Sequence, residues 1–286
     1  MINIKKVTVL GAGNMGKQIA IQIARSGFQV FCYEQIEAVV NSATEFADDW
    51  FAKRVEKGKM TAEDAEVLRS NLHITSDISF ACNDSDLVIE AVPDVAEIKK
   101  KVFAEVDQHT PDRTIYTSNS SYIVSSKLCE SVKDPSKMCN MHFFNPALVM
   151  KTVEVVRGLH SSEETVNTVF EFAKAIDKDP IMVNKEIYGF VVNRIFSAIT
   201  DEALYLVDSG IATPEDIDKA VKGALGHKMG PLETLDMTGI DLEYSVHVEK
   251  FRTFGNPAYR PATCITEMYA KGEFGRKTGK GFYEYK

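Results

Sequence analysis

Residues 5–16 read KKVTVLGAGNMG, an apolar run followed at once by three glycines in the pattern GxGxxG. The run Lys5–Leu10 has the length and composition of a buried strand, and Asn14–Ser26 has the apolar spacing of a helix that Gly27 ends. A strand, a glycine turn and a helix in this order are typical of a Rossmann-type dinucleotide-binding unit. The alternative is a glycine turn that only packs a helix against a sheet.

The glycine turn suits a pyrophosphate. Its glycines permit a tight turn and a close backbone approach, so that the phosphates can lie on the helix N-terminus. The residues expected at this cofactor site are Gly11, Gly13, Asn14, Met15 and Gly16. Glu34 ends the second predicted strand, Phe28–Tyr33, where a carboxylate can accept hydrogen bonds from an adenosine ribose. A carboxylate repels a 2′-phosphate, which favours NAD over NADP.

The rest of the first 118 residues alternates short apolar runs with amphipathic stretches, the pattern of βα units and a parallel sheet. Further strands are predicted at Asp86–Val92 and Thr114–Ser118, separated by a helix at Glu97–His109. Two more helices, Ile36–Lys57 and one beginning at Thr61, form an insertion between the second and third predicted strands.

Beyond residue 186 the pattern becomes helical, with predicted helices at Phe190–Val207 and from Thr213. We therefore expect a Rossmann-type α/β domain with a helical insertion over residues 1–187. An all-α domain is expected over residues 188–286. A chain of 286 residues is long enough for two such domains.

Composition excludes several classes of protein. With 41 acidic and 33 basic residues, the net charge of −8 argues against a broad nucleic-acid surface. No run approaches 18 apolar residues, so no membrane span is expected. Five widely spaced cysteines suggest reduced thiols, and a strand beginning within six residues of Met1 leaves no room for a leader peptide. We expect a cytoplasmic protein.

A second constellation surrounds His142. Strands are predicted at Lys137–Phe144 and Val149–Val156, on either side of an Asn-Pro turn. If they pair antiparallel about residue 148, His142 and Glu154 lie opposite each other on one face. The carboxylate would fix the imidazole tautomer and leave the other nitrogen as a base. The alternative is a half-buried histidine in a structural ion pair.

The other histidines show no comparable partner in an apolar setting, and they are interpreted as surface or structural residues: His73, His109, His160, His227 and His247. The sequence has no HExxH motif and no Cys/His cluster, so no metal site is expected.

Taken together, these motifs resemble the L-3-hydroxyacyl-CoA dehydrogenase family, and within it the short bacterial 3-hydroxybutyryl-CoA dehydrogenases. The resemblance covers essentially the whole chain. It is carried by GAGNMG at 11–16, SNSS at 118–121, HFFNP at 142–146, VEVV at 153–156, GFVVNR at 189–194, MGPLETLD at 229–236 and GRKTGKGFYEY at 275–285.

The resemblance implies reversible oxidation of an (S)-3-hydroxyacyl-CoA at C3, with NAD as the cofactor. His142 would be the catalytic base and Glu154 its orienting carboxylate. Ser121 and Asn193 would hydrogen-bond the substrate oxygens where charge develops. Without the resemblance, Ser121 would be interpreted as an ordinary turn serine and Asn193 as a polar residue on an exposed helix face.

Further residues take roles from the same resemblance. Asp94, Lys99 and Asn119 would contact the cofactor, although the run Lys99-Lys100-Lys101 is also typical of a solvated helix face. Lys53 and Lys57, one helical turn apart, would bind the 3′-phosphate of the acyl-CoA substrate, with a solvated face again the alternative. The helical domain would form a homodimer.

Two departures from the family pattern occur beside the site: Tyr188 replaces the usual Pro, and Ala147-Leu148 replaces Val-Pro. Other functions also remain open. They are a dehydrogenase of a non-CoA hydroxy acid, of the gulonate or carnitine type, and a crystallin-like NAD binder without turnover. A lysine-based hydroxyacid dehydrogenase is disfavoured because Phe190–Val207 contains no lysine.

Overall fold

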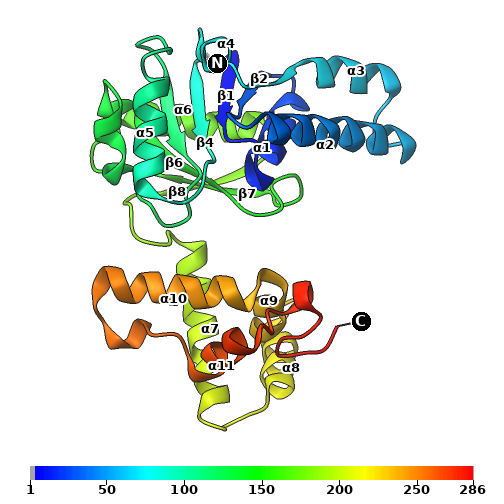
Figure 1. Ribbon diagram of the computed structural model, residues 1–286, viewed down its shortest axis with the longest axis vertical. Helices are drawn as coiled ribbons and strands as arrows, with labels where there is room; N and C mark the ends of the chain where they lie inside the picture. Colours follow the sequence, from blue (N-terminus) through cyan, green and yellow to red (C-terminus); the bar gives the residue numbers. More distant parts are fainter. Residues whose placement is uncertain (1–3, 286) are drawn as a thin grey trace. The chain divides into compact units, whose positions relative to one another are not determined.

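The computed structural model describes residues 4–285 of the chain. The chain divides into two compact units, Met1–Val191 and Val192–Lys286, a few residues beyond the boundary at 187 that the change of pattern indicated (Figure 1). The first unit contains a sheet flanked by helices, and the second is helical over the residues described. The predicted fold class is therefore confirmed. No described helix is both long and apolar enough to cross a membrane.

The sheet of the first unit has the strand order β3-β2-β1-β4-β5-β6-β7-β8. The strands from β3 across to β6 are parallel, β7 runs antiparallel to β6, and β8 is parallel to β7. Their bounds are β1 (Lys6–Leu10), β2 (Gln29–Tyr33), β3 (Leu72–Thr75), β4 (Leu87–Glu90), β5 (Ile115–Ser118), β6 (Met138–Phe143), β7 (Thr152–Val156) and β8 (Asp179–Val183).

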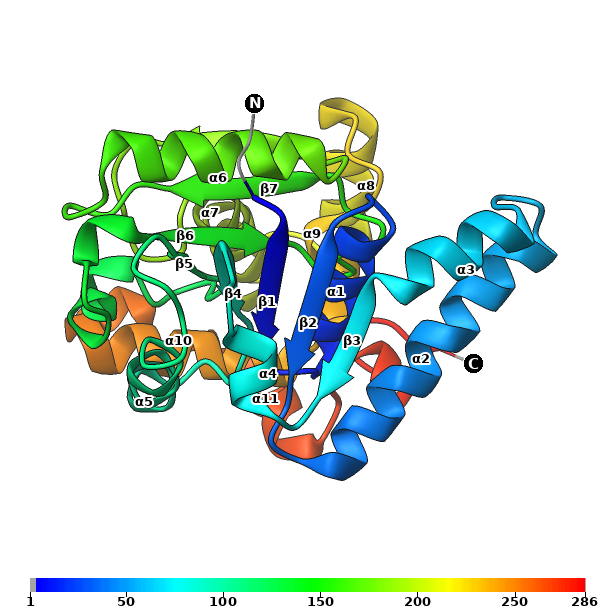
Figure 2. The same ribbon diagram turned by 90° about the horizontal axis from the view of Figure 1, so that it is seen from above.

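Helices connect these strands. Figure 2 shows α2 and α3, the predicted insertion, side by side and extending away from the edge strand β3. The α-helices of the first unit are α1 (Asn14–Ala24), α2 (Glu37–Glu56), α3 (Ala62–Ser70), α4 (Ile78–Cys82), α5 (Ala96–Val106) and α6 (Glu163–Ala175). Short 3-10 helices η1 (Ser125–Lys127), η2 (Cys129–Ser131) and η3 (Pro135–Lys137) lie between β5 and β6.

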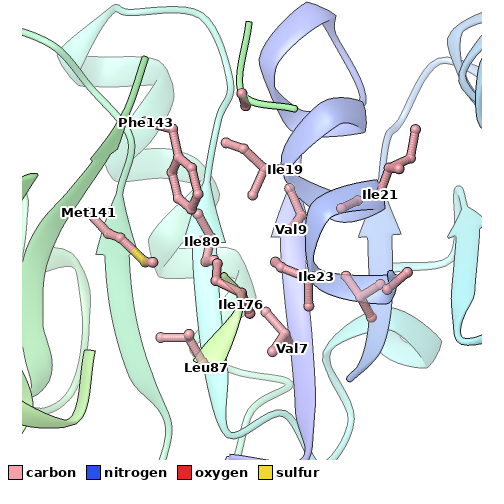
Figure 3. Packing of buried hydrophobic residues seen from close by; sticks show 14 of the residues in the cluster. Val7, Val9, Ile19, Ile21, Ile23, Leu87, Ile89, Met141, Phe143 and Ile176 are labelled. Carbon is pink, nitrogen blue, oxygen red and sulfur yellow. The ribbon is translucent and has the colours of Figure 1, made fainter. Parts of the chain in front are cut away.

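The alternation of side chains along each strand produces two apolar clusters, one on each face of the sheet. In β1, Val7 and Val9 pack against α1 and α6, whereas Leu10 belongs to the cluster with α4 and α5. Figure 3 shows Ile19 and Ile23 of α1 beside these strand residues. Burial on both faces explains why the strands are continuous apolar runs.

The predicted strands of the first unit are all present, but the sequence interpretation missed two. β3 is only four residues long, Leu72–Thr75, and three of them are partly exposed at the end of the sheet. β8, Asp179–Val183, has an exposed–intermediate alternation and includes Pro180. Because edge strands need neither an apolar run nor a complete set of backbone donors, their sequence signal is weak.

The second unit consists of α7 (Val192–Asp208), α8 (Pro214–Leu225), α9 (Pro231–Thr238), α10 (Ile240–Phe254) and α11 (Thr263–Lys271), with short 3-10 helices η4 (Pro257–Tyr259) and η5 (Arg276–Thr278). The predicted cap at Thr213 is confirmed, since its hydroxyl accepts the backbone N–H of Asp216 at 3.2 Å. Apolar residues of α7, α8, α9, α10 and α11 form the core of this unit.

Candidate active site

The glycine turn has the geometry that a dinucleotide site requires. Gly11 adopts a φ of 89°, in the region that favours glycine, and a Cβ on Gly16 would lie 1.8 Å from the carbonyl oxygen of Gly11. Gly13 is exposed, and a Cβ there would meet nothing within 4 Å. No described side chain caps the N-terminus of α1. Space and uncapped amide groups therefore coincide where a pyrophosphate would bind.

Glu34 lies beside this turn, as the sequence predicted. Its Oε2 accepts the N–H of Ala12 at 3.1 Å, and its Oε1 accepts the N–H of Ile36 at the same distance. These two bonds hold a carboxylate at the carboxyl end of β2. There it can meet a ribose of a dinucleotide bound on the turn.

His142 and Glu154 are direct partners across the antiparallel pair β6–β7, the register that the spacing predicted. Glu154 Oε2 lies 2.7 Å from Nδ1 of His142, and the two residues are 0% and 3% exposed. The other carboxylate oxygen of Glu154 accepts the N–H of Val191 at 2.9 Å. A carboxylate held at Nδ1 keeps the hydrogen on that nitrogen and leaves Nε2 as the acceptor.

Nε2 of His142 lies 3.0 Å from Oγ of Ser121, in the turn after β5. Two aromatic rings pack near the imidazole, Phe144 at 4.6 Å and Phe190 at 5.6 Å between ring centroids. The structure thus places a serine hydroxyl, an imidazole and a carboxylate in a hydrogen-bonded series, Ser121–His142–Glu154. In apolar surroundings, such an arrangement can take up and return one proton.

Asn145, three residues after His142, contacts the glycine turn, and the sequence analysis did not assign this contact. Its Oδ1 accepts a hydrogen bond from Nδ2 of Asn14 at 3.3 Å. Asn119, expected to contact the cofactor, accepts the N–H of Phe143 through its Oδ1 at 2.8 Å and so also positions β6. The sequence signal that could have indicated a role for Asn145 is its position directly after His142-Phe143-Phe144.

Lys99 is buried, so the alternative of a solvated lysine face does not hold for it, and its contact with the cofactor stays a prediction. It is 1% exposed, and Nζ lies 2.6 Å from Oε1 of Glu90 and 3.4 Å from Asp94. Glu90 also accepts the hydroxyl of Ser118 at 2.6 Å, and Asp94 accepts that of Ser120 at 2.5 Å. Burial raises the pKa of Glu90, against the lowering effect of the lysine. This buried network lies where β4 and β5 end.

The remaining predicted residues are placed separately. Lys53 and Lys57 are exposed at the end of α2, and Nζ of Lys53 lies 2.6 Å from Oδ2 of Asp49. Asn193 is the second residue of α7 and belongs to the second unit, whereas His142 belongs to the first.

His247, interpreted from the sequence as a surface or structural histidine without a comparable partner, is buried beside two carboxylates. It is 4% exposed, and Nε2 lies 3.1 Å from Asp201 Oδ1 and 3.1 Å from Glu243 Oε1. Burial lowers the pKa of His247, but the two carboxylates outweigh it and raise the pKa to about 9. Asp201 is remote from His247 in sequence, so spacing carried no signal for this contact.

Known proteins match both units. Residues 6–187 match the family model "3-hydroxyacyl-CoA dehydrogenase, NAD binding domain", and residues 189–285 match the C-terminal domain of the same family. A 3-hydroxybutyryl-CoA dehydrogenase of Clostridioides difficile is 36% identical, over 98% of this chain and 99% of the relative.

Solved structures agree with these matches. The crystal structure of an (S)-3-hydroxybutyryl-CoA dehydrogenase from Ralstonia eutropha is 34% identical, with a TM-score of 0.93 over 99% of this chain and 100% of that one. A diketoreductase structure is 32% identical, with a TM-score of 0.88 over 100% of both chains. The chain belongs to the 3-hydroxyacyl-CoA dehydrogenase family, and its first unit is the NAD-binding domain of that family.

Proposed function

We propose that this protein catalyses the reversible NAD-dependent oxidation of (S)-3-hydroxybutyryl-CoA, or a similarly short 3-hydroxyacyl-CoA, to the 3-oxoacyl-CoA. The observation that carries the proposal is the hydrogen-bonded series Ser121–His142–Glu154. Nε2 of His142 lies 3.0 Å from the serine Oγ, and Nδ1 lies 2.7 Å from the glutamate Oε2. Asn145, three residues after His142, accepts a hydrogen bond from Asn14 of the glycine turn. NAD bound at that turn supplies the hydride acceptor.

The chemistry required of the protein is movement of one proton. Nε2 of His142 takes the proton of the C3 hydroxyl as the C3–H bond breaks, and returns it in the opposite direction. Glu154, fully buried, stabilises the imidazolium that forms and keeps the ring oriented. Burial strengthens this interaction because little water screens it.

Ser121 positions the reacting oxygen. Its hydroxyl already lies within hydrogen-bond distance of Nε2, so an alcohol or carbonyl oxygen beside this pair, about 3 Å from each atom, would contact both. We assign Asn193, in the second unit, as the other donor to the substrate oxygens. Such donors lower the barrier when negative charge develops on oxygen during reduction of the carbonyl.

Acyl-CoA recognition is proposed on two grounds. Relatives that span nearly the whole chain are named as 3-hydroxybutyryl-CoA dehydrogenases. In addition, Lys53, in the last turn of α2, and Lys57, the residue after α2, are both exposed, so that their ammonium groups can meet the 3′-phosphate of the ADP moiety. Lys53 would exchange its partner Asp49 for the phosphate at little cost, because exposed ion pairs contribute little.

The decisive measurement is NADH oxidation by the full chain with acetoacetyl-CoA, compared with free acetoacetate and with a non-CoA dicarbonyl compound. Turnover with acetoacetyl-CoA that His142→Ala abolishes supports the proposal. Turnover only with the dicarbonyl compound would instead make the protein a relative of the diketoreductase in activity. Absence of turnover with all three substrates would favour an NAD binder without catalysis.

A second measurement tests the CoA site. Lys53→Ala/Lys57→Ala should raise KM for acetoacetyl-CoA while leaving KM for the acetoacetyl-pantetheine thioester unchanged, because pantetheine lacks the ADP group. Lys174→Ala is the matched control, since Lys174 is another exposed lysine paired with a carboxylate of its own helix. An unchanged KM for acetoacetyl-CoA would remove both lysines from the site.

We also propose that the protein is a homodimer. The second unit leaves large apolar side chains exposed on three of its helices, namely Tyr205, Leu225 and Leu242. Light scattering coupled to size exclusion should give about twice the chain mass of 31.8 kDa. A mass equal to one chain would contradict this proposal.

A further inference from the structure

Two helices of the second unit share a cluster of possible metal ligands. Asp201 lies on α7, whereas Glu243 and His247 lie one turn apart on α10. One ligand atom from each residue falls within 4.8 Å of the others. All three belong to the second unit, whereas the His142–Glu154 pair belongs to the first. None of the three is among the residues proposed for catalysis, although Asn193 also lies on α7.

Two carboxylate oxygens in this cluster face one imidazole nitrogen, which can donate only one hydrogen. Nε2 of His247 lies 3.1 Å from an oxygen of Asp201 and 3.1 Å from an oxygen of Glu243, but it carries one hydrogen at most. That hydrogen bonds Glu243, and within residues 4–285 the buried Oδ1 of Asp201 has no hydrogen-bond partner. Within this part of the chain, Oδ1 of Asp201 therefore has an ion-pair partner but no hydrogen bond of its own, and a cation at this point would bind both carboxylates.

The net negative charge of the cluster also favours binding of a cation. Two carboxylates face one imidazole, and over the described part of the chain no Lys or Arg nitrogen lies within 4.0 Å of either carboxylate. Even with the imidazole protonated, the cluster keeps a net charge of −1. A divalent cation in place of the proton would bind both carboxylates and the neutral imidazole together.

The distances fit a tetrahedral metal site. Bonds of about 2.0–2.1 Å place neighbouring ligand atoms of a tetrahedral ion about 3.3 Å apart. Both separations from Nε2 are 3.1 Å, and all three ligand atoms lie within 4.8 Å of one another. The side chain of Asp201 is 41% exposed and provides a route from solvent, whereas His247 is buried.

We propose that Asp201, Glu243 and His247 form a binding site for a divalent transition-metal ion of the Zn²⁺ type. One imidazole nitrogen and two carboxylate oxygens are a ligand set that Zn²⁺ accepts, with water in the fourth position. Because the ligands come from α7 and α10, the ion links these helices. Its role is to stabilise the second unit.

The test is a titration of the chelator-treated, desalted full chain with Zn²⁺, followed by calorimetry. We expect one site, and Co²⁺ in its place should show the visible absorption of a tetrahedral complex. Zn²⁺ should also raise Tm. Affinity should be greater at pH 8 than at pH 6, because the metal and a proton compete for the imidazole.

Variants connect the binding to these residues. His247→Asn, Glu243→Gln and Asp201→Asn should each weaken Zn²⁺ binding at least tenfold. Asp201→Asn leaves the buried residues in place, so it remains informative if His247→Asn fails to fold. His227→Asn, at an exposed histidine, and His142→Asn, at the catalytic pair, should leave the affinity unchanged.

Three results would overturn the proposal. The first is Zn²⁺ binding no tighter than that of a chain in which Asp201→Asn and Glu243→Gln are combined. The second is binding that persists in His247→Asn. The third is binding that disappears in His142→Asn instead, which would place the ion at the catalytic pair.

Discussion

Nδ1 of His142 lies 2.7 Å from Oε2 of Glu154, directly across the strand pair β6–β7. Neither side chain is accessible to an appreciable extent, and the second oxygen of Glu154 is held by the N–H of Val191. The orientation of the imidazole is therefore set by two rigid strands. This preorganisation costs nothing at the moment of proton transfer.

Glu154→Gln should lower kcat by about 10²–10⁴-fold, because an amide cannot stabilise the imidazolium and favours the wrong tautomer of His142. The amide oxygen can still accept the N–H of Val191, so the fold should be retained. The measurement is the rate of NADH oxidation with acetoacetyl-CoA, together with Tm. A kcat within twofold of wild type and an unchanged pH profile would show that the carboxylate is not needed.

Glu34→Gln should increase the use of NADPH relative to NADH. The carboxylate beside the glycine turn repels a 2′-phosphate, and the amide removes that charge while retaining an acceptor for the N–H of Ala12 or Ile36. A change of about tenfold or more in the ratio of kcat/KM values is expected, equivalent to about 1.4 kcal/mol. If the ratio does not change, Glu34 does not select the cofactor.

Lys99→Met should destabilise the first unit by about 3–5 kcal/mol, because it leaves the buried carboxylate of Glu90 without its cation. Replacing both residues, Lys99→Met with Glu90→Met, should recover much of that loss. Urea unfolding monitored by circular dichroism measures both effects. Equal losses in the single and double variants would show that the ion pair is not what stabilises this region.

Lys178 connects β8 to the segment between β6 and β7. It is 4% exposed, and Nζ donates to the carbonyl oxygens of Ala147 at 2.5 Å and Met150 at 2.8 Å. Burial and the nearby cations Arg25 and Lys151 lower the pKa of Lys178 to about 8.

The pH dependence of stability should reveal this lysine. Its ordinary pKa is 10.5, so between about pH 8 and pH 10.5 the unfolded chain binds the proton more readily than the folded chain. Stability therefore rises with pH through this window, by about 3 kcal/mol from this group. Methionine does not titrate, so the unfolding free energy of the wild type minus that of Lys178→Met should increase with pH across this window. A difference that is constant from pH 7 to pH 10 would contradict the shifted pKa.

Local sequence pattern was sufficient for the glycine turn and for the His142–Glu154 register. The strand Lys6–Leu10 and the turn after it depend on apolar residues and glycines that are adjacent in the chain. Their local conformation can therefore be predicted from the local sequence. The pairing of His142 with Glu154 follows from two short antiparallel strands that are consecutive in the chain. The even sequence separation of the two residues is what predicted that they share one face.

The burial of Lys99 and the contact of His247 with Asp201 followed from tertiary packing alone. Lys99 belongs to a run of three lysines, and only the docking of α5 on the sheet buries it against Glu90. His247 meets Asp201 because α7 and α10 pack together within the second unit. Burial and the approach of distant charges depend on how whole elements pack. No property of the neighbouring residues in the chain encodes them, although they determine which lysine or histidine has an unusual pKa or a possible ligand.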